Sequence, residues 1–144
     1  MKPNETVDYN IKITWHAISR MYNEQASKHG STAAVGFVLL NIDAKEGTPA
    51  TKIGPALGME ATSLARMLKN LEQDKLICRV HDKNDKRLVR IFLTEKGKEA
   101  RETAKKVVKK FNNAVREAVP EEKLQTFFEV MEKINNIIAD KNIY

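Results

Sequence analysis

Hydrophobic residues recur three or four positions apart near both ends of the chain, which predicts helices there. The apolar positions of the first predicted helix are Ile11, Trp15, Ile18, Tyr22 and Ala26. We expect this helix to end near Gly30 and a second helix to begin at Ser31. The inward positions of the second helix are Val35, Val38, Leu39 and Ile42. Residues 45–47 are expected to end it.

The C-terminal third of the chain predicts two further helices. Thr94 is placed to cap the first of them, which should run to about Ala118 because Pro120 breaks it. Pro120 then opens a last helix with a wide apolar stripe. The members of this stripe are Leu124, Phe127, Phe128, Met131, Ile134 and Ile138.

The centre of the chain holds two shorter predicted helices joined by a tight turn. Thr51 is placed to cap the first helix and Gly58 to end it. The inward positions of this helix are Ile53, Ala56 and Leu57. The second helix turns Leu64, Met67, Leu68 and Leu71 inward, and its outer face carries Thr62, Ser63, Arg66, Lys69 and Asn70. This arrangement is typical of a helix-turn-helix that enters the major groove of DNA.

Two strands are predicted to follow these helices, at residues 76–80 and 88–93. The sequence between them, HDKNDKR, has no apolar residue and is rich in turn formers, so the strands should form a hairpin with a basic tip. Residues 48–50 are expected to add a short third strand. The predicted fold class is therefore mainly α with a small β-wing, a winged helix-turn-helix core with additional N- and C-terminal helices.

The wing and the residues after it resemble the multiple-antibiotic-resistance-regulator (MarR) family. The family pattern is an Asp-x-Arg wing, then alternating apolar residues and Leu-Thr-x-x-Gly. The residues in register with it are Asp85, Arg87, Val89, Ile91, Leu93, Thr94 and Gly97. By this resemblance, Arg87 would enter the minor groove and Asp85 would orient the wing. One position departs from the family: Lys75 stands where a glycine often follows the recognition helix, so this helix is expected to end differently.

The resemblance implies a sequence-specific transcriptional regulator that binds an inverted repeat in double-stranded DNA as a homodimer. It also implies a repressor that a small ligand, often aromatic or phenolic, releases from its operator. Trp15, His16 and Tyr22 would line such a ligand pocket, although at helical spacing they also fit a packed core. A protein-interaction module that uses the winged helix to bind a protein partner is the alternative function.

Net charge supports the DNA-binding interpretation. The chain carries +6, and basic residues outnumber acidic ones by nine to five between Lys52 and Arg90. An ordinary solvated basic surface would give the same count. The predicted DNA-binding residues are Thr62, Ser63, Arg66, Lys69, Lys83, Asp85, Lys86 and Arg87. A lysine stripe on the helix after Thr94 is interpreted as a solvated face and is not included.

The terminal helices carry more apolar surface than the central lobe needs to cover its core. We expect them to pack against a second copy of the chain. The predicted dimer interface consists of Ile11, Trp15, Leu124, Phe127, Phe128, Met131, Ile134 and Ile138. The alternative is that the helices cover one another within one chain.

The remaining residues give little indication of catalysis. His16, His29 and His81 are scattered, and no catalytic triad, phosphate loop or paired-histidine motif is visible, so we expect neither an enzyme nor a cofactor. Cys78 and His81 have the spacing of a metal-ligand pair, but zinc usually takes four ligands, so no metal site is predicted. Cys78 is expected to be a small buried residue in its strand.

Length and composition predict one domain over residues 1–144, with a DNA-binding lobe at 31–93 and dimerisation helices at 1–30 and 94–144. The chain has no run of eighteen apolar residues and no signal sequence at its start, so we expect a cytoplasmic protein that does not enter a membrane. A single cysteine excludes an intrachain disulfide.

Overall fold

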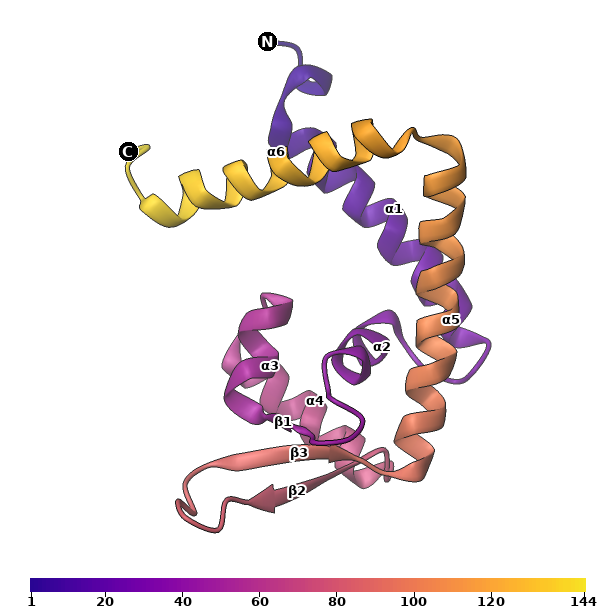
Figure 1. Cartoon of the computed structure of the whole chain (residues 1–144), viewed down its shortest axis with the longest axis vertical. Helices are drawn as coiled ribbons and strands as arrows, with labels where there is room; N and C mark the ends of the chain where they lie inside the picture. Colours follow the sequence, from indigo (N-terminus) through magenta and orange to yellow (C-terminus); the bar gives the residue numbers. More distant parts are fainter. The chain divides into compact units, whose positions relative to one another are not determined.

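Helices make up most of the chain, and a small sheet takes one strand from between the second and third α-helices and two strands from between the fourth and fifth (Figure 1). The computed structural model describes residues 1–144. The chain forms two compact units, Met1–Val107 and Val108–Tyr144.

The first unit contains every strand and the helices that pack on them. Its elements are η1 (Pro3–Glu5), α1 (Val7–Ser27), α2 (Ala33–Leu40), β1 (Thr48–Pro49), α3 (Ala50–Leu57), α4 (Ala61–Gln73), β2 (Ile77–His81), β3 (Val89–Leu93) and the first part of α5 (Glu95–Ala118). The second unit contains the rest of α5 and α6 (Glu121–Asp140). The mainly α class with a β-wing is therefore confirmed.

The core of the first unit lies between helices α2 to α4 and one face of the sheet. Its buried members are Val38, Leu39, Ile42, Ile53, Leu64, Leu68, Leu71, Ile77, Ile91 and Leu93. The sheet has the order β1-β3-β2 and is antiparallel throughout, so β3 is its central strand. Ile77 pairs with Leu93 at one end of the β2–β3 ladder, and His81 pairs with Val89 at the other. Burial of aliphatic side chains from both layers is the main force that holds the lobe together.

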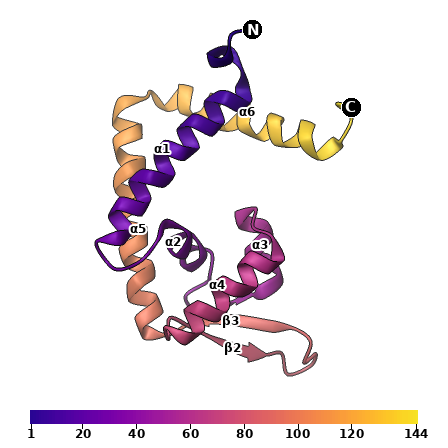
Figure 2. The same cartoon turned by 180° about the vertical axis from the view of Figure 1, so that it is seen from behind.

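A close contact joins the start of α5 to the end of the preceding lobe. The Thr94 hydroxyl accepts a hydrogen bond from the Gly97 N–H (3.0 Å) and donates one to the Lys75 carbonyl (2.6 Å). Gly97 packs so closely that a Cβ there would overlap the Leu76 carbonyl oxygen. Seen from behind in Figure 2, α4 ends beside the start of α5. The predicted cap at Thr94 is confirmed, and α5 ends at Ala118 as expected.

Several predicted boundaries hold, and others need correction. The short strand at residues 48–49 and the helix opened by Pro120 are confirmed. Thr51 is not the cap of α3, because the helix already begins at Ala50 and Pro49 occupies the cap position. Ala56 is exposed, so the predicted inward face was wrong at that position. The second helix starts at Ala33, after Thr32, whose side chain accepts from the Val35 N–H, and ends at Leu40, earlier than expected.

Cys78 is exposed, which corrects the prediction that it is buried. Neighbouring residues of a strand point to opposite faces of the sheet. Since Ile77 lies in the core, Cys78 must point away from it. β2 is also an edge strand, so no further strand covers it on its open side.

None of the helices combines the length and the apolar composition needed to span a lipid bilayer.

Candidate nucleic-acid interface

The turn between α3 and α4 is tight because two glycines permit it. Gly58 ends α3 in the left-handed conformation (φ 63°), and the Met59 N–H bonds back to the Gly54 carbonyl at 3.0 Å. Gly54 is buried, and a Cβ there would come within 3.2 Å of the Leu64 side chain on α4. The sequence predicted the role of Gly58, but the close approach of the two helices at Gly54 was missed.

Helix α4 divides sharply into a buried and an exposed face. Leu64, Leu68 and Leu71 are buried in the core. The predicted DNA-binding residues of this helix are all exposed on the other side: Thr62, Ser63, Arg66 and Lys69. Short polar side chains near the N-terminus let the backbone approach base edges, and the long Arg66 side chain can reach further. The face therefore has the shape and chemistry of a recognition helix.

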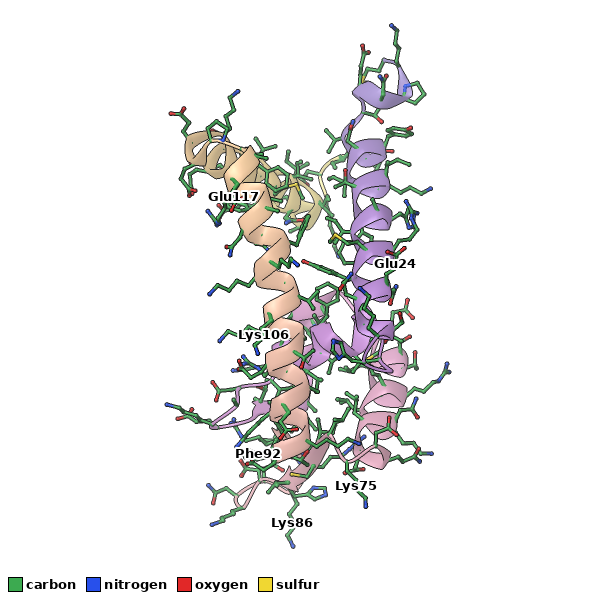
Figure 3. All side chains as sticks on the ribbon, turned by 90° about the vertical axis from the view of Figure 1, so that its right-hand side faces the viewer. Glu24, Lys75, Lys86, Phe92, Lys106 and Glu117 are labelled. Atoms are coloured by element: carbon green, nitrogen blue, oxygen red, sulfur yellow. The ribbon has the colours of Figure 1, made fainter.

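α4 ends on a residue with positive φ that is not glycine. Lys75 has φ 61°, its N–H bonds to the Glu72 carbonyl (3.0 Å), and the Leu76 N–H bonds to the Leu71 carbonyl (2.9 Å). These two bonds form a Schellman motif. The expectation that the helix would end differently here was wrong, because Lys75 adopts the conformation that glycine favours. Figure 3 shows Lys75 at this end of the helix.

The loop between β2 and β3 is organised by Asp82. One oxygen of its carboxylate accepts hydrogen bonds from the N–H groups of Asn84 (2.8 Å) and Asp85 (3.1 Å). The Asp82 N–H donates to the Leu88 carbonyl across the loop (2.9 Å). Such side-chain to backbone bonds stabilise tight turns. The sequence predicted a turn here but not the residue that holds it.

Arg87 and Asp85 form a bidentate ion pair at the wing tip. The Arg87 Nε and Nη2 groups donate to the two carboxylate oxygens at 3.1 and 3.2 Å, and the Arg87 backbone N–H donates to Oδ1 at 3.0 Å. The side-chain bond, and then the backbone bond, lower the pKa of Asp85 below its usual value. The Arg87 side chain is nevertheless 90% exposed. The pair therefore orients a cation that remains accessible to a ligand.

Lys83 and Lys86 belong to the same loop, and both are exposed. Figure 3 shows Lys86 pointing away from the hairpin. The structure therefore brings four of the predicted residues together in one loop: Lys83, Asp85, Lys86 and Arg87.

Arg90 anchors the wing to the loop before β1. Its Nη1 group donates to the carbonyls of Glu46 (3.2 Å) and Gly47 (3.3 Å). That loop is itself held by Asp43, whose carboxylate accepts from the N–H groups of Lys45 and Glu46, both at 2.8 Å. The Glu46 bond, and then the Lys45 bond, lower the pKa of Asp43. Charge counting alone could not assign Arg90 to this structural role.

The predicted ligand-pocket residues lie on α1. The rings of Trp15 and Tyr22 both approach Phe37 on α2, with centroid distances of 5.9 and 5.7 Å. Tyr22 is buried, and this burial raises the pKa of its hydroxyl. His16 is exposed, while Phe37 was not singled out in the sequence. Aromatic rings in such tilted and edge-on contacts fit a packed cluster as well as the wall of a binding site.

The apolar residues of the terminal helices remain largely exposed. On α6, Phe127, Phe128 and Ile138 are 53%, 45% and 61% exposed, and Met131 and Ile134 are half-buried. On α1, Ile11 and Trp15 are also exposed. Leu124 differs from the other predicted interface residues because it is already buried within the single chain.

The fold and the exposed polar face of α4 define a winged helix-turn-helix protein. The sequence model described as "MarR family" matches residues 32–89. The regulator SarZ of Staphylococcus aureus is 30% identical over 105 residues, which are 70% of this chain and 71% of SarZ. The chain belongs to the MarR family. The regulator TtmR of Methylorubrum extorquens is 36% identical over 83 residues, but these are 58% of this chain and only 43% of TtmR.

Solved structures of regulators share the fold over nearly the whole chain. The DNA complex of MepR from S. aureus superposes with a TM-score of 0.83 at 22% identity, covering 91% of this chain and 97% of MepR. PcaV of Streptomyces coelicolor, solved with its natural ligand, has a TM-score of 0.81 at 17% identity and covers 94% of this chain and 96% of PcaV. The curated relatives SarZ and TtmR are both described as HTH-type transcriptional regulators.

Proposed function

We propose that the protein is a sequence-specific transcriptional regulator that binds double-stranded DNA. The observation that carries this proposal is that one lobe contains both an exposed polar helix face, on α4, and a basic wing. α4 presents Thr62, Ser63, Arg66 and Lys69 on one exposed face, and the wing presents an oriented, accessible Arg87. A helix of this kind reads base edges in the major groove, while an arginine beside it suits the adjacent narrow minor groove. Lys83 and Lys86 are placed to neutralise phosphates.

We further propose that the regulator acts as a homodimer on an inverted repeat. Support comes from the exposed apolar side chains of α6 and α1, which would be costly to leave in water. A symmetric dimer would present two copies of α4, and the two half-site centres would lie about one helical turn, or roughly 10 bp, apart. The protein would act by binding DNA and not by catalysis. It would act in the cytoplasm, as expected for a regulator of this class.

The most direct test is selection of bound duplexes from random sequence, repeated at two salt concentrations. We expect enrichment of a two-fold symmetric site whose affinity falls steeply with salt, with a log–log slope of about −0.9 for each phosphate contacted. An Arg66→Ala protein passed through the same selection is the matched control and should enrich the site poorly. If wild-type protein enriches no sequence at either salt concentration, the proposal is wrong and a protein partner becomes the better hypothesis.

The regulator is proposed to be a repressor that a small aromatic anion releases from DNA, bound beside Trp15, His16 and Tyr22. Support comes from the aromatic cluster with Phe37 and from the ligand complex described for PcaV. Trp15 is the only tryptophan, so intrinsic fluorescence reports this site directly. Titration with phenolic carboxylates should quench the fluorescence and weaken operator binding over the same concentration range. Unchanged fluorescence and affinity across such compounds would remove the effector from the proposal.

A further inference from the structure

One peptide unit at the wing tip is held on both sides by side chains. The unit joins Lys86 to Arg87. Its N–H, which belongs to Arg87, donates to Asp85 Oδ1 at 3.0 Å. Its carbonyl, which belongs to Lys86, lies 3.0 Å from Nδ1 of His81. Two bonds to opposite edges of a planar peptide fix the rotation of that plane, and hence the direction in which the Arg87 side chain leaves the backbone.

The hydrogen bond to the carbonyl also determines where the His81 proton resides. A carbonyl oxygen only accepts, so Nδ1 must carry the hydrogen. His81 itself is held in register, because it is the last residue of β2 and pairs with Val89 on β3. The ring therefore connects the ordered end of the hairpin ladder to the loop beyond it.

We propose that His81 is a positioning residue for the DNA-binding wing, acting through Arg87. Asp85 holds the guanidinium and one edge of the Lys86–Arg87 peptide, and His81 holds the other edge. Without His81 the peptide can rotate, and Arg87 samples directions in which it does not meet the groove. This inference rests on the proposed DNA-binding function, but the tautomer that it requires can be measured without DNA.

The first measurement is the nitrogen NMR spectrum of the histidine rings in the free protein under alkaline conditions, where a neutral imidazole carries a single N–H. His81 should have the Nδ1–H tautomer. His29 is exposed, serves as the internal control and should show the Nε2–H form that free imidazole side chains prefer. An Nε2–H tautomer at His81 would overturn the inference whatever the protein does with DNA.

The second measurement compares two substitutions that differ in hydrogen-bonding ability. His81→Phe retains an aromatic ring but has no donor, and should weaken operator binding by about two- to tenfold, the range expected for the loss of one hydrogen bond. His81→Asn places an amide N–H near the position of Nδ1 and should restore most of that affinity. Equal losses for the two variants would contradict a role for the hydrogen bond.

A double-mutant cycle tests whether the effect passes through Arg87. In an Arg87→Ala background, His81→Phe should have no further effect on operator affinity, because no guanidinium is left to position. A His81→Phe loss of the same size in both backgrounds would show that His81 contacts DNA or supports the fold independently, and would overturn the proposal. If the wild-type protein binds no DNA, the proposed function fails, while the ring tautomer still decides whether His81 holds the wing tip.

Discussion

Replacing Lys75 by glycine should stabilise the protein. Lys75 is an L-residue at φ 61°, and the left-handed conformation costs roughly 1–2 kcal/mol for a residue with a Cβ. Glycine removes that cost but makes the unfolded chain more flexible, which opposes the gain by about 0.4–1 kcal/mol. The two Schellman bonds are made by backbone groups and remain. The net expectation is a gain of about 0.5–1 kcal/mol.

Gly58 provides the matched reverse experiment. It has φ 63°, nearly the value at Lys75, and a Cβ there would meet no atom within 4 Å. Gly58→Ala therefore introduces backbone strain without a clash, and should destabilise the protein by about the amount that Lys75→Gly stabilises it. Both variants are compared with wild type by thermal unfolding, followed by circular dichroism at one fixed protein concentration because association shifts Tm. For a chain of this size we expect Tm changes of about 1–4 °C in opposite directions.

The result that would refute this reasoning is a lower Tm for Lys75→Gly together with a lower Tm for Gly58→Ala. The argument from backbone strain would then hold at Gly58. At position 75, the lysine side chain would have to stabilise the folded state by more than the backbone strain destabilises it. Operator affinity should be measured for the same variants. Lys75 is exposed near the end of the recognition helix, so a gain in stability with a loss of affinity would show that the lysine has a role in DNA binding.

Three further predictions concern DNA binding and assembly. Arg66→Ala should lose about 1–3 kcal/mol on the selected operator and little on random duplex, whereas Lys83→Ala should weaken both alike in anisotropy titrations. Equal losses for Arg66→Ala on both duplexes would assign Arg66 to phosphates. Arg87→Lys cannot retain the bidentate pair with Asp85, so the variant should lose any preference for A·T-rich flanks. If its affinity for DNA with narrow and with wide minor grooves matched that of wild type, Arg87 would be a simple phosphate contact. Phe128→Glu puts a charge into the proposed dimer interface, so the variant should sediment as a monomer and bind the operator more weakly. A wild-type chain that is already monomeric at micromolar concentration would disprove the dimer.

The elements that the sequence predicted well are those with local signals. The capping side chain of Thr94 sets the start of α5, and Pro120, with its fixed φ, sets the end of α5 and the start of α6 where expected. The inward residues of α4 repeat at helical spacing: Leu64, Leu68 and Leu71 are buried, and Met67 is partly buried against the core. Gly58 adopts the positive φ that its position required. In each case the physical cause lies within a few residues of the chain.

The features that could not be predicted depend on contacts between distant segments. Thr51 has the side chain of a cap, but pairing of Thr48 and Pro49 with β3 sets the start of α3 two residues earlier than a cap at Thr51 requires. Cys78 sits among apolar neighbours, yet the pleat and the edge position of β2 turn it outward. The burial of Gly54 could not be predicted, because a residue without a side chain does not contribute to a pattern of hydrophobic positions. Only the approach of Leu64, which would lie 3.2 Å from an added Cβ, shows that a larger residue at position 54 would crowd the neighbouring helix.

Charge illustrates the same limit at the proposed DNA-binding surface. A count along the sequence treats every basic residue between Lys52 and Arg90 as equal, whereas the structure divides them by what they already bind. The Arg90 guanidinium donates to two backbone carbonyls, and Arg79 Nε lies 3.6 Å from Glu72 Oε1. Arg66 and Lys69, in contrast, are exposed on α4 without an ion-pair partner. Arg87 is both paired and exposed, so in the proposed complex the DNA phosphates or bases would compete with Asp85 for its guanidinium. Phosphate affinity and orientation are therefore opposed at that residue, since the carboxylate that aims the arginine also cancels part of its attraction for DNA.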